Sequence, residues 1–411
     1  MKLSTIPEPS DKRLAIRITP DATRHLRRGH PWIYDQAITK RSHDGKPGDL
    51  AVIFDKDRSF LAIGLYDPGS PIRIKVLHEG SPKQIDQDFW NERLTTAERL
   101  RGPLKTDLVQ PTTGYRCVNG ENDGLPGLIL DRYADTYVLK LYSEAWFPHL
   151  SMITQAIIDV YQPESVILRL SRSVQKAETF DLVEGDALVG PKPVGPVLFS
   201  EYGLTFEADV VAGQKTGHFL DQRQNRKRIG ELADGADVLD VFSCTGGFSV
   251  HAAAGGAASV LSVDQSGPAL ATARANMAHN QTNPVVAACA HTTRQGDAYQ
   301  VMAALRGTKK FDVVVVDPPS FAQKQSSISA GINSYSKLTE AAVPLVNPGG
   351  ILLQASCSSR ISVDQFFTAV RSGAETHGRS LEILEHSTHA LDHPVTFEQG
   401  SYLKALVARV G

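Results

Sequence analysis

Cysteine is scarce in this 411-residue chain, and long apolar runs are missing. The four cysteines, at positions 117, 244, 289 and 357, are far apart and form no Cys-x-x-Cys pair. This argues against a zinc site and against a disulfide framework, so we expect no metal and a reducing, cytoplasmic environment. No segment approaches the roughly 20 apolar residues of a membrane helix. The first residues also lack the apolar core of a secretory signal, so we expect no membrane partner.

An excess of charge is missing too, since the formal net charge is −2. The basic residues are nevertheless unevenly spread. Eight Lys or Arg residues but only two acids lie between Lys12 and Arg41, and five but only one acid between Lys215 and Arg228. Such local patches suit a phosphate-binding surface, although a solvated charged face explains each patch equally well. The candidate RNA contacts are Arg24, Arg27, Arg28 and Lys215.

The length favours two or three domains, and the predicted pattern of strands and helices changes twice along the chain. Residues 1–78 contain short strands separated by Gly, Pro and Asp turns, which predicts a small β-rich domain. Residues 79–200 combine a helical pattern with strands, which indicates an α+β domain. Between 201 and 411 strands and helices alternate, which predicts a doubly wound α/β sheet. In this last region we expect a helix over Ser336–Val346, ended by Asn347-Pro348-Gly349-Gly350.

Ligands of such sheets bind beyond the carboxyl ends of the strands. The first turn, Asp240–Ser249, does not fit the Gly-x-Gly-x-x-Gly dinucleotide motif, which counts against a nicotinamide oxidoreductase. Its Gly246-Gly247 pair allows close approach of a ligand, and a tight turn is the plain structural alternative. Asp264 ends the next strand, in position for ribose hydroxyls, and Asp297 follows, in position for an adenine amino group. Together these residues predict S-adenosylmethionine as the cofactor.

Two later strand ends carry reactive groups. Asp317 follows four valines and precedes two prolines, and a strand-ending Pro-Pro explains the turn but not the carboxylate. Cys357 stands where the apolar run Ile351–Ala355 passes into Ser-Cys-Ser-Ser. If the two strands are neighbours, a thiolate there is placed to attack C6 of a cytosine, with Asp317 at N3. A small buried hydrophobe is an equally good interpretation of Cys357.

The motifs DQRQNR, DVFSCTGGFSVHA, SVDQS, FDVVVVDPPSF, NPGGILLQASCSS and DHPV resemble the bacterial 23S rRNA cytosine-5 methyltransferase family. GHPWIYDQAI (29–38) and GENDGLPGLILDRY (120–133) resemble the first two domains of that family, so the likeness covers nearly the whole chain. It implies a PUA RNA-binding domain, a central EEHEE domain and a C-terminal class I, Rossmann-like methyltransferase domain. It also implies that Cys357 is the nucleophile beside Asp317, and that rRNA or a ribosomal subunit precursor is the partner. The resemblance assigns to S-adenosylmethionine the residues Asp221, Arg223, Asp240, Phe242, Ser243, Thr245, Gly246, Gly247, Asp264, Gln265 and Asp297.

Two features leave alternatives open. RNA cytosine-5 methyltransferases more broadly carry a second cysteine after the proline of the Asp-Pro-Pro motif, used in product release, whereas this chain has Pro319-Ser320. The base that removes the C5 proton is therefore unassigned. Related enzymes methylate guanine N7 or exocyclic amines, and in such a reaction Cys357 of this chain would have no catalytic role. A non-catalytic RNA-binding or ribosome-assembly protein that retains a cofactor pocket is a further alternative. The target nucleotide and the oligomeric state stay open, a homodimer included.

Overall fold

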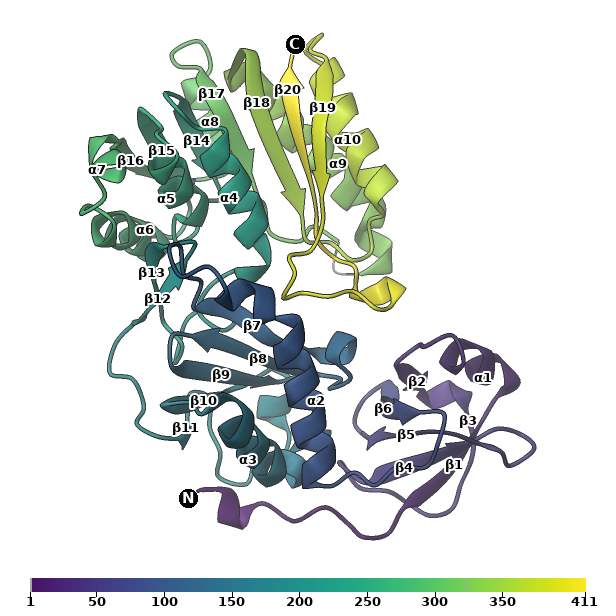
Figure 1. The fold of residues 1–411 in the computed structure, drawn as a ribbon. Coiled ribbons are helices and arrows are strands. Elements are labelled where there is room, and N and C mark those ends of the chain that lie inside the picture. Colours follow the sequence, from purple (N-terminus) through teal and green to yellow (C-terminus); the bar gives the residue numbers. More distant parts are fainter. Residues whose placement is uncertain (1, 323) are drawn as a thin grey trace. The chain divides into compact units, whose positions relative to one another are not determined.

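A computed structural model describes residues 2–322 and 324–411, which fold into two compact units (Figure 1). The first unit runs to Ser200 and also includes Ala208–His218 and Leu391–Gly400. The second consists of Glu201–Glu207, Phe219–Ala390 and Ser401–Gly411. The domain boundaries expected at residues 78 and 200 stay predictions. Within the described residues no helix is long and apolar enough to cross a membrane.

The N-terminal part of the first unit is a six-stranded sheet of order β2-β6-β5-β4-β1-β3. Only the β1–β4 pair is parallel. Alternating aliphatic residues such as Leu14 and Ile16 are fully buried and form its core, because successive side chains of a strand point to opposite faces. The elements are β1 Leu14–Ile18, α1 Pro20–Leu26, β2 Trp32–Tyr34, β3 Ile38–Arg41, β4 Leu50–Phe54, β5 Phe60–Tyr66 and β6 Ile72–Glu79.

Helix α1 lies within this β-rich part, between β1 and β2. Thr19 accepts a hydrogen bond from the backbone N–H of Ala22, and Pro20 occupies the first helical position. Both features favour the start of a helix. The short pattern is hard to recognise, because only Thr23 and Leu26 of its seven residues are buried.

The central part of the first unit is a five-stranded sheet of order β11-β10-β9-β8-β7, accompanied by two helices (Figure 1). Asp86 caps α2, whose Phe89, Trp90 and Leu94 enter the core. Trp146 joins them there, and its ring lies 5.6 Å from that of Trp90. The elements are α2 Gln87–Leu100, β7 Gly114–Asn119, β8 Leu128–Tyr133, β9 Thr136–Leu141, α3 Leu150–Tyr161, β10 Ser165–Leu170 and β11 Ala187–Val189.

The second unit is a seven-stranded sheet of order β16-β15-β14-β17-β18-β20-β19, in which only β20 is antiparallel to its neighbours. Helices α4, α5 and α6 cover one face and α8, α9 and α10 the other (Figure 1). This confirms the predicted doubly wound α/β fold. A separate two-stranded sheet pairs β12 Val197–Glu201 with β13 Leu204–Ala208. The elements are α4 Arg223–Glu231, β14 Asp237–Val241, α5 Gly247–Ala254, β15 Ser259–Asp264, α6 Gly267–His279, α7 Pro284–Ala288, β16 Ala290–Gln295, α8 Ala298–Leu305, β17 Phe311–Val316, α9 Ile328–Ala342, β18 Val346–Ser356, α10 Val363–Glu375, β19 Leu381–Ser387 and β20 Lys404–Val410.

The expected end of the helix at Asn347–Gly350 is wrong. Helix α9 already ends at Ala342, and a 3-10 turn containing Pro344 follows it. Proline cannot continue the hydrogen-bonding pattern of a helix, so it stops α9 early. The Asn-Pro-Gly-Gly segment lies inside β18, where the register with β17 shifts between the pairs Phe311–Val346 and Val313–Ile351.

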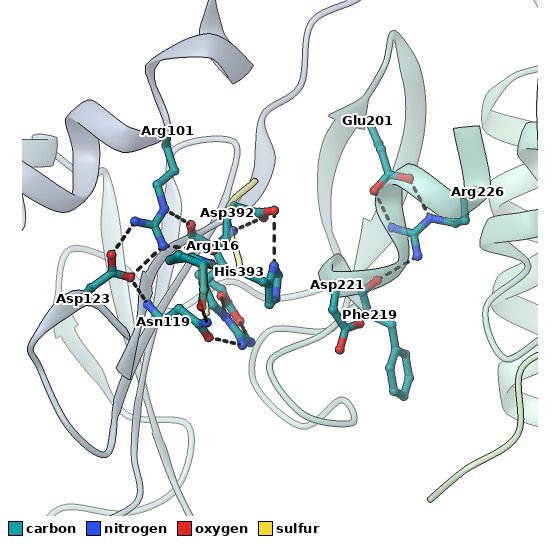
Figure 2. Close-up of polar contacts among 12 residues, drawn as sticks. Arg101, Arg116, Asn119, Asp123, Glu201, Phe219, Asp221, Arg226, Asp392 and His393 are labelled. Atoms are coloured by element: carbon teal, nitrogen blue, oxygen red, sulfur yellow. Dashed lines mark hydrogen bonds and ion pairs between the residues drawn. The ribbon is translucent and has the colours of Figure 1, made fainter. Parts of the chain in front are cut away.

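A buried ionic network fixes Leu391–Gly400 in the first unit (Figure 2). The guanidinium of Arg101 is fully buried and donates two hydrogen bonds of 2.7 Å to the carboxylate of Asp123. It also donates to the backbone carbonyl of Asp392, at 2.9 Å. The Asp392 carboxylate in turn accepts from the backbone N–H of Arg116, also at 2.9 Å. Every charge in the network thus has a partner, as buried charges require.

Removing one partner of this network should unfold the first unit at lower urea concentration. Asp123→Ala leaves the Arg101 charge buried without its carboxylate, and we expect a loss of about 3–5 kcal/mol in the free energy of unfolding. Tryptophan fluorescence measures it, because Trp32, Trp90 and Trp146, the three tryptophans of the chain, all belong to this unit. The control is Asp21→Ala, which removes the partner of exposed Arg24 and should cost about 0–1 kcal/mol. Equal losses would contradict the prediction.

Candidate active site

The carboxyl ends of four parallel strands meet at one edge of the seven-stranded sheet. Val241 of β14 pairs with Val263 of β15 and with Val316 of β17, and Val316 pairs with Gln354 of β18. The chain changes direction at β14, because β15 and β16 lie on one side of it and β17 and β18 on the other. Doubly wound sheets bind their ligands at such a switch point. The loops that follow these strands carry most of the predicted site residues.

The loop after β14 has an unusual backbone conformation. Phe242, Cys244 and Gly246 have positive φ angles of 64°, 47° and 75°. Left-handed conformations at non-glycine residues are uncommon and cluster at functional sites. Asp264 holds the loop, since its carboxylate accepts from the backbone N–H groups of Cys244 at 2.9 Å and Ser266 at 2.8 Å. Each carboxylate oxygen retains acceptor capacity for the hydroxyl groups of a ligand.

The two glycines of this loop are required by their neighbours. A Cβ atom on Gly246 would lie 2.8 Å from the Cβ of Ala273, and one on Gly247 would lie 2.6 Å from the Cδ of Arg226. Arg226 cannot easily move away, because it is held by a buried ion pair. Gly246 and Gly247 therefore allow α6 and α4 to pack closely against the start of α5.

The ion pair joins Arg226 to Glu201 (Figure 2). The guanidinium donates to the two carboxylate oxygens at 2.7 and 2.5 Å, and His251 lies 2.9 Å from the same carboxylate. Burial acts to raise the pKa of Glu201, but the charge of Arg226 and the hydrogen bonds of Arg226 and His251 outweigh it and hold the pKa well below its usual range. This pair is structural support for the loop.

Asp240 and Ser243 place two polar atoms in the interior beneath the loop. Asp240 is fully buried, and Ser249 donates a hydrogen bond of 2.6 Å to its carboxylate. Burial raises the pKa of Asp240 to about 7. Among the described residues, its second oxygen and the buried hydroxyl of Ser243 have no hydrogen-bond partner. Buried polar atoms without partners are rare, and a ligand rich in polar groups would satisfy them.

Gln265 and Asp297 come together on neighbouring loops. The Gln265 amide donates a hydrogen bond of 3.0 Å to the Asp297 carboxylate, which also caps α8 by accepting from the backbone N–H of Gln300. Thr245 is held through its backbone carbonyl, which accepts from the Asn276 amide at 2.8 Å. Both Gln265 and Asp297 remain accessible to a ligand.

Asp317 is oriented by a residue that was not predicted. The Gln222 amide donates to the Asp317 carboxylate at 2.9 Å, and the Asn225 amide donates to Gln222 at 2.5 Å. Gln222 lies between the predicted residues Asp221 and Arg223, which are both buried, and the Tyr402 hydroxyl donates to Asp221 at 2.9 Å. The loop before α4 therefore reaches the end of β17 through Gln222.

Cys357 is half-buried and lies directly after β18. Both of its chain neighbours, Ser356 and Ser358, belong to a chain of hydrogen-bonded hydroxyl groups. The Ser356 hydroxyl donates to that of Tyr335 at 2.8 Å, and the hydroxyls of Tyr335 and Ser320 each lie 2.9 Å from that of Ser358. Burial raises the pKa of Tyr335, the hydrogen bonds from Ser356 and Ser358 lower it, and the charges of Cys357 and Asp317 raise it further. Cys357 and Asp317 thus both act electrostatically on Tyr335.

Lys404 is the other residue that sequence reasoning missed at this edge. It begins β20, opposite Ser356, and is 3 % exposed. A signal existed in each case: Lys404 interrupts the apolar run of the last strand, and Gln222 lies inside the DQRQNR motif. Neither could be placed without knowing which strands are neighbours.

The candidate RNA contacts all belong to the first unit. Arg24, Arg27, Arg28 and Lys215 are exposed. Arg24 pairs with Asp21 at 2.6 Å and Arg27 with Asp55 at 3.3 Å. Their role in RNA binding stays a prediction.

Comparisons with known proteins identify the family. A family model described as S-adenosylmethionine-dependent methyltransferase matches residues 160–409, more than half of the chain. The chain belongs to the S-adenosylmethionine-dependent methyltransferases. A PUA-like domain model matches residues 16–79, which confirms the predicted PUA-like N-terminal domain. The family also confirms the expected cofactor.

Relatives of this methyltransferase match it over nearly its whole length. A ribosomal RNA large subunit methyltransferase of Deinococcus radiodurans is 44 % identical, covering 97 % of this chain and 98 % of the relative. The ribosomal RNA large subunit methyltransferase I of Shewanella frigidimarina is 37 % identical over 97 % and 99 %. The crystal structure of SMU.776, complexed with SAH, shares the fold with a TM-score of 0.81, at 21 % identity and coverage of 97 % and 99 %.

The loop after β14 fits the cofactor of this methyltransferase. Asp264 retains acceptors for ribose hydroxyls, and the Ser243 hydroxyl and one Asp240 oxygen lack partners in the described residues. A ligand with an amino acid group, a ribose and an adenine has the polar atoms to meet them. The individual assignments of these residues, and of Phe242, Thr245, Gln265, Asp297, Asp221 and Arg223, stay predictions.

Gly246→Ala should weaken binding of S-adenosylmethionine at least tenfold. The new Cβ would collide with Ala273 in a backbone that already has φ +75°, so the loop must move. Isothermal titration of purified protein measures the affinity. Gly235→Ala is the matched control: it has φ +68° with nothing within 4 Å of the added Cβ and should cost about 1 kcal/mol of stability without changing affinity. Unchanged affinity in Gly246→Ala would refute the role of the loop.

Asp240 should make the stability of the second unit fall as pH rises from about 4 to 7. Its folded-state pKa of about 7 exceeds the unfolded value of about 3.9, so in this window the folded state binds the extra proton. The free energy of unfolding then falls by about 1.4 kcal/mol per pH unit from this group alone. Asp240→Asn removes this contribution to the pH dependence of the free energy of unfolding. The difference in melting temperature between wild type and Asp240→Asn, measured by circular dichroism, should therefore decline between pH 4.5 and 7. A constant difference would contradict the protonated state.

Proposed function

We propose that the protein methylates C5 of a cytosine in large-subunit ribosomal RNA, with Cys357 as the covalent nucleophile. The relatives named as ribosomal RNA large subunit methyltransferases support the substrate class. The observation that carries the cytosine-5 assignment is the position of Cys357 and Asp317 at the ends of the adjacent strands β18 and β17. The exposed arginines near α1 and the PUA-like domain suit the phosphates of the RNA.

Cytosine C5 needs such a pair, because it is a poor nucleophile in the free base. When the Cys357 sulfur forms a bond to C6, the electron pair of the C5–C6 double bond becomes available at C5. A carboxylic acid that donates to N3 assists this addition, and Asp317, held by Gln222, is the residue for that role. S-adenosylmethionine, when bound, supplies the electrophilic methyl group. Loss of the C5 proton to a base then restores the double bond and expels the sulfur as thiolate.

The target cytosine must leave the RNA helix to reach Cys357 and Asp317. Enzymes that modify a base inside folded RNA take it out of the stack and hold it in a pocket. Asp317-Pro318-Pro319 provides a rigid wall for it, because proline fixes the backbone and has no N–H to donate. The same geometry explains why Cys357 needs to be half-buried: the sulfur must reach C6 and must also be shielded from water.

Release of the C5 hydrogen tests the proposal. Transcribed large-subunit rRNA carrying tritium at cytosine C5 is incubated with S-adenosylmethionine and enzyme. We expect wild type to release tritium in step with methylation, and Cys357→Ala to lose both by at least a thousandfold, because the thiolate begins the reaction. The matched control is Cys289→Ala, which removes a buried cysteine that follows α7 and should retain activity.

Methyl transfer without tritium release would overturn the cytosine-5 assignment and point to guanine N7 or an exocyclic amine. Full activity of Cys357→Ala would do the same, and would leave Cys357 as a packing residue. Absence of methyl transfer to rRNA, with the cofactor bound, would refute the substrate class.

A further inference from the structure

The buried side chain of Lys404 lies at the strand end that carries Cys357. Lys404 is the first residue of β20 and pairs with Ser356, the last residue of β18, so the two strands meet next to Cys357. Its exposed fraction is 3 %. The strand residues that follow it, Ala405 to Ala408, are almost entirely buried and apolar. Packing alone would be better served by an aliphatic side chain.

The Lys404 ammonium has no carboxylate partner within the described residues. It donates to two backbone carbonyls, those of Ser358 at 2.7 Å and Tyr402 at 3.3 Å. A lysine has three N–H donors, so one remains. Almost all buried lysines are paired with an opposite charge, because removing an ammonium from water is costly. The arrangement therefore lacks a negative group beside Lys404.

Cys357 is the group in reach that can become negative. Lys404 donates to the carbonyl of Ser358, the residue that follows Cys357. A negative charge on Cys357 would attract the Lys404 ammonium. Burial lowers the pKa of Lys404 to about 8, and the charge of Cys357 opposes that decrease. Asp317 and Tyr335, which lie at the same edge, are acids and would disfavour a thiolate. Lys404 favours one.

We propose that Lys404 is the positioning residue that keeps Cys357 ionised, by donating its third N–H to the sulfur. The thiol proton goes to solvent, and the resulting thiolate and ammonium form a buried pair. This inference rests on the proposed role of Cys357 as nucleophile, but it concerns the free enzyme and can be measured without RNA or cofactor.

The test measures the reactivity of Cys357 against pH. Iodoacetamide alkylates thiolates, so the rate for the peptide containing Cys357, followed by mass spectrometry from pH 5 to 10, gives the midpoint of ionisation. We expect the wild-type midpoint to lie below the ordinary value of about 8.5. Lys404→Met, of similar length but neutral, should raise the midpoint by about one unit or more, and Lys404→Arg should stay within half a unit of wild type. The alkylation rate at pH 7 should fall about threefold per unit, because a more basic thiolate is also more reactive.

Cys244 serves as the internal control in every sample. Burial and the nearby Asp264 raise its pKa to about 11, so it should react slowly up to pH 10 in wild type and variants alike. If Lys404 only braces the two carbonyls, Lys404→Met will lower the melting temperature and leave the Cys357 midpoint unchanged, which overturns the inference. A wild-type midpoint at or above 8.5 overturns it too. A third outcome is that Lys404→Met raises the Cys357 midpoint as expected while the wild-type enzyme transfers methyl groups without releasing tritium. That combination supports the Lys404–Cys357 pair and refutes only the cytosine-5 function.

Discussion

Hydrogen bonding between the parallel strands β14, β17 and β18 is the constraint on which the candidate site depends. It sets Val241 beside Val316 and Val316 beside Gln354, so the glycine loop, Asp317 and Cys357 all begin at one edge of the sheet. A shift of one residue in any pair would turn alternate side chains to the opposite face. The register is secure because these strands are covered on both faces, and Val313 to Val316 are at most 1 % exposed.

The antiparallel direction of β20 brings its first residue, Lys404, to the edge of the sheet where the site lies. β18 runs toward the site edge and β20 runs away from it, so the first residue of β20 lies beside the last residue of β18. A parallel strand in that position would follow from a crossover connection and would bring its last residue instead. The chain enters β20 from Leu391–Gly400, which belongs to the first unit and is held there by Arg101 and Arg116. Within the second unit, pairing with β18 fixes the start of β20.

Local signals in the sequence were sufficient for the strands and for the residues at their ends. The four valines before Asp317 and the apolar run before Cys357 predict buried parallel strands. Helix α1 was missed because its apolar pattern is too short, and the end of α9 was misplaced because Pro344, rather than the glycines, stops it. Gln222 and Lys404 needed the tertiary structure, since one acts through a side-chain contact 95 residues along the chain and the other through strand order.

The presence of Lys404 bears on the two interpretations of Cys357. As a packing residue, Cys357 would stay neutral, and the ammonium would face the carbonyls of Ser358 and Tyr402 with no carboxylate partner in the described residues. The Ser358 and Tyr402 carbonyls do not require a charge, because a neutral donor or water satisfies a carbonyl equally well. As a nucleophile, Cys357 supplies the missing negative charge, and the burial that penalises an isolated lysine strengthens the attraction within the pair. The cost of burying Lys404 therefore favours a thiolate at the end of β18, and a thiolate is what cytosine-5 chemistry uses and N7 methylation does not.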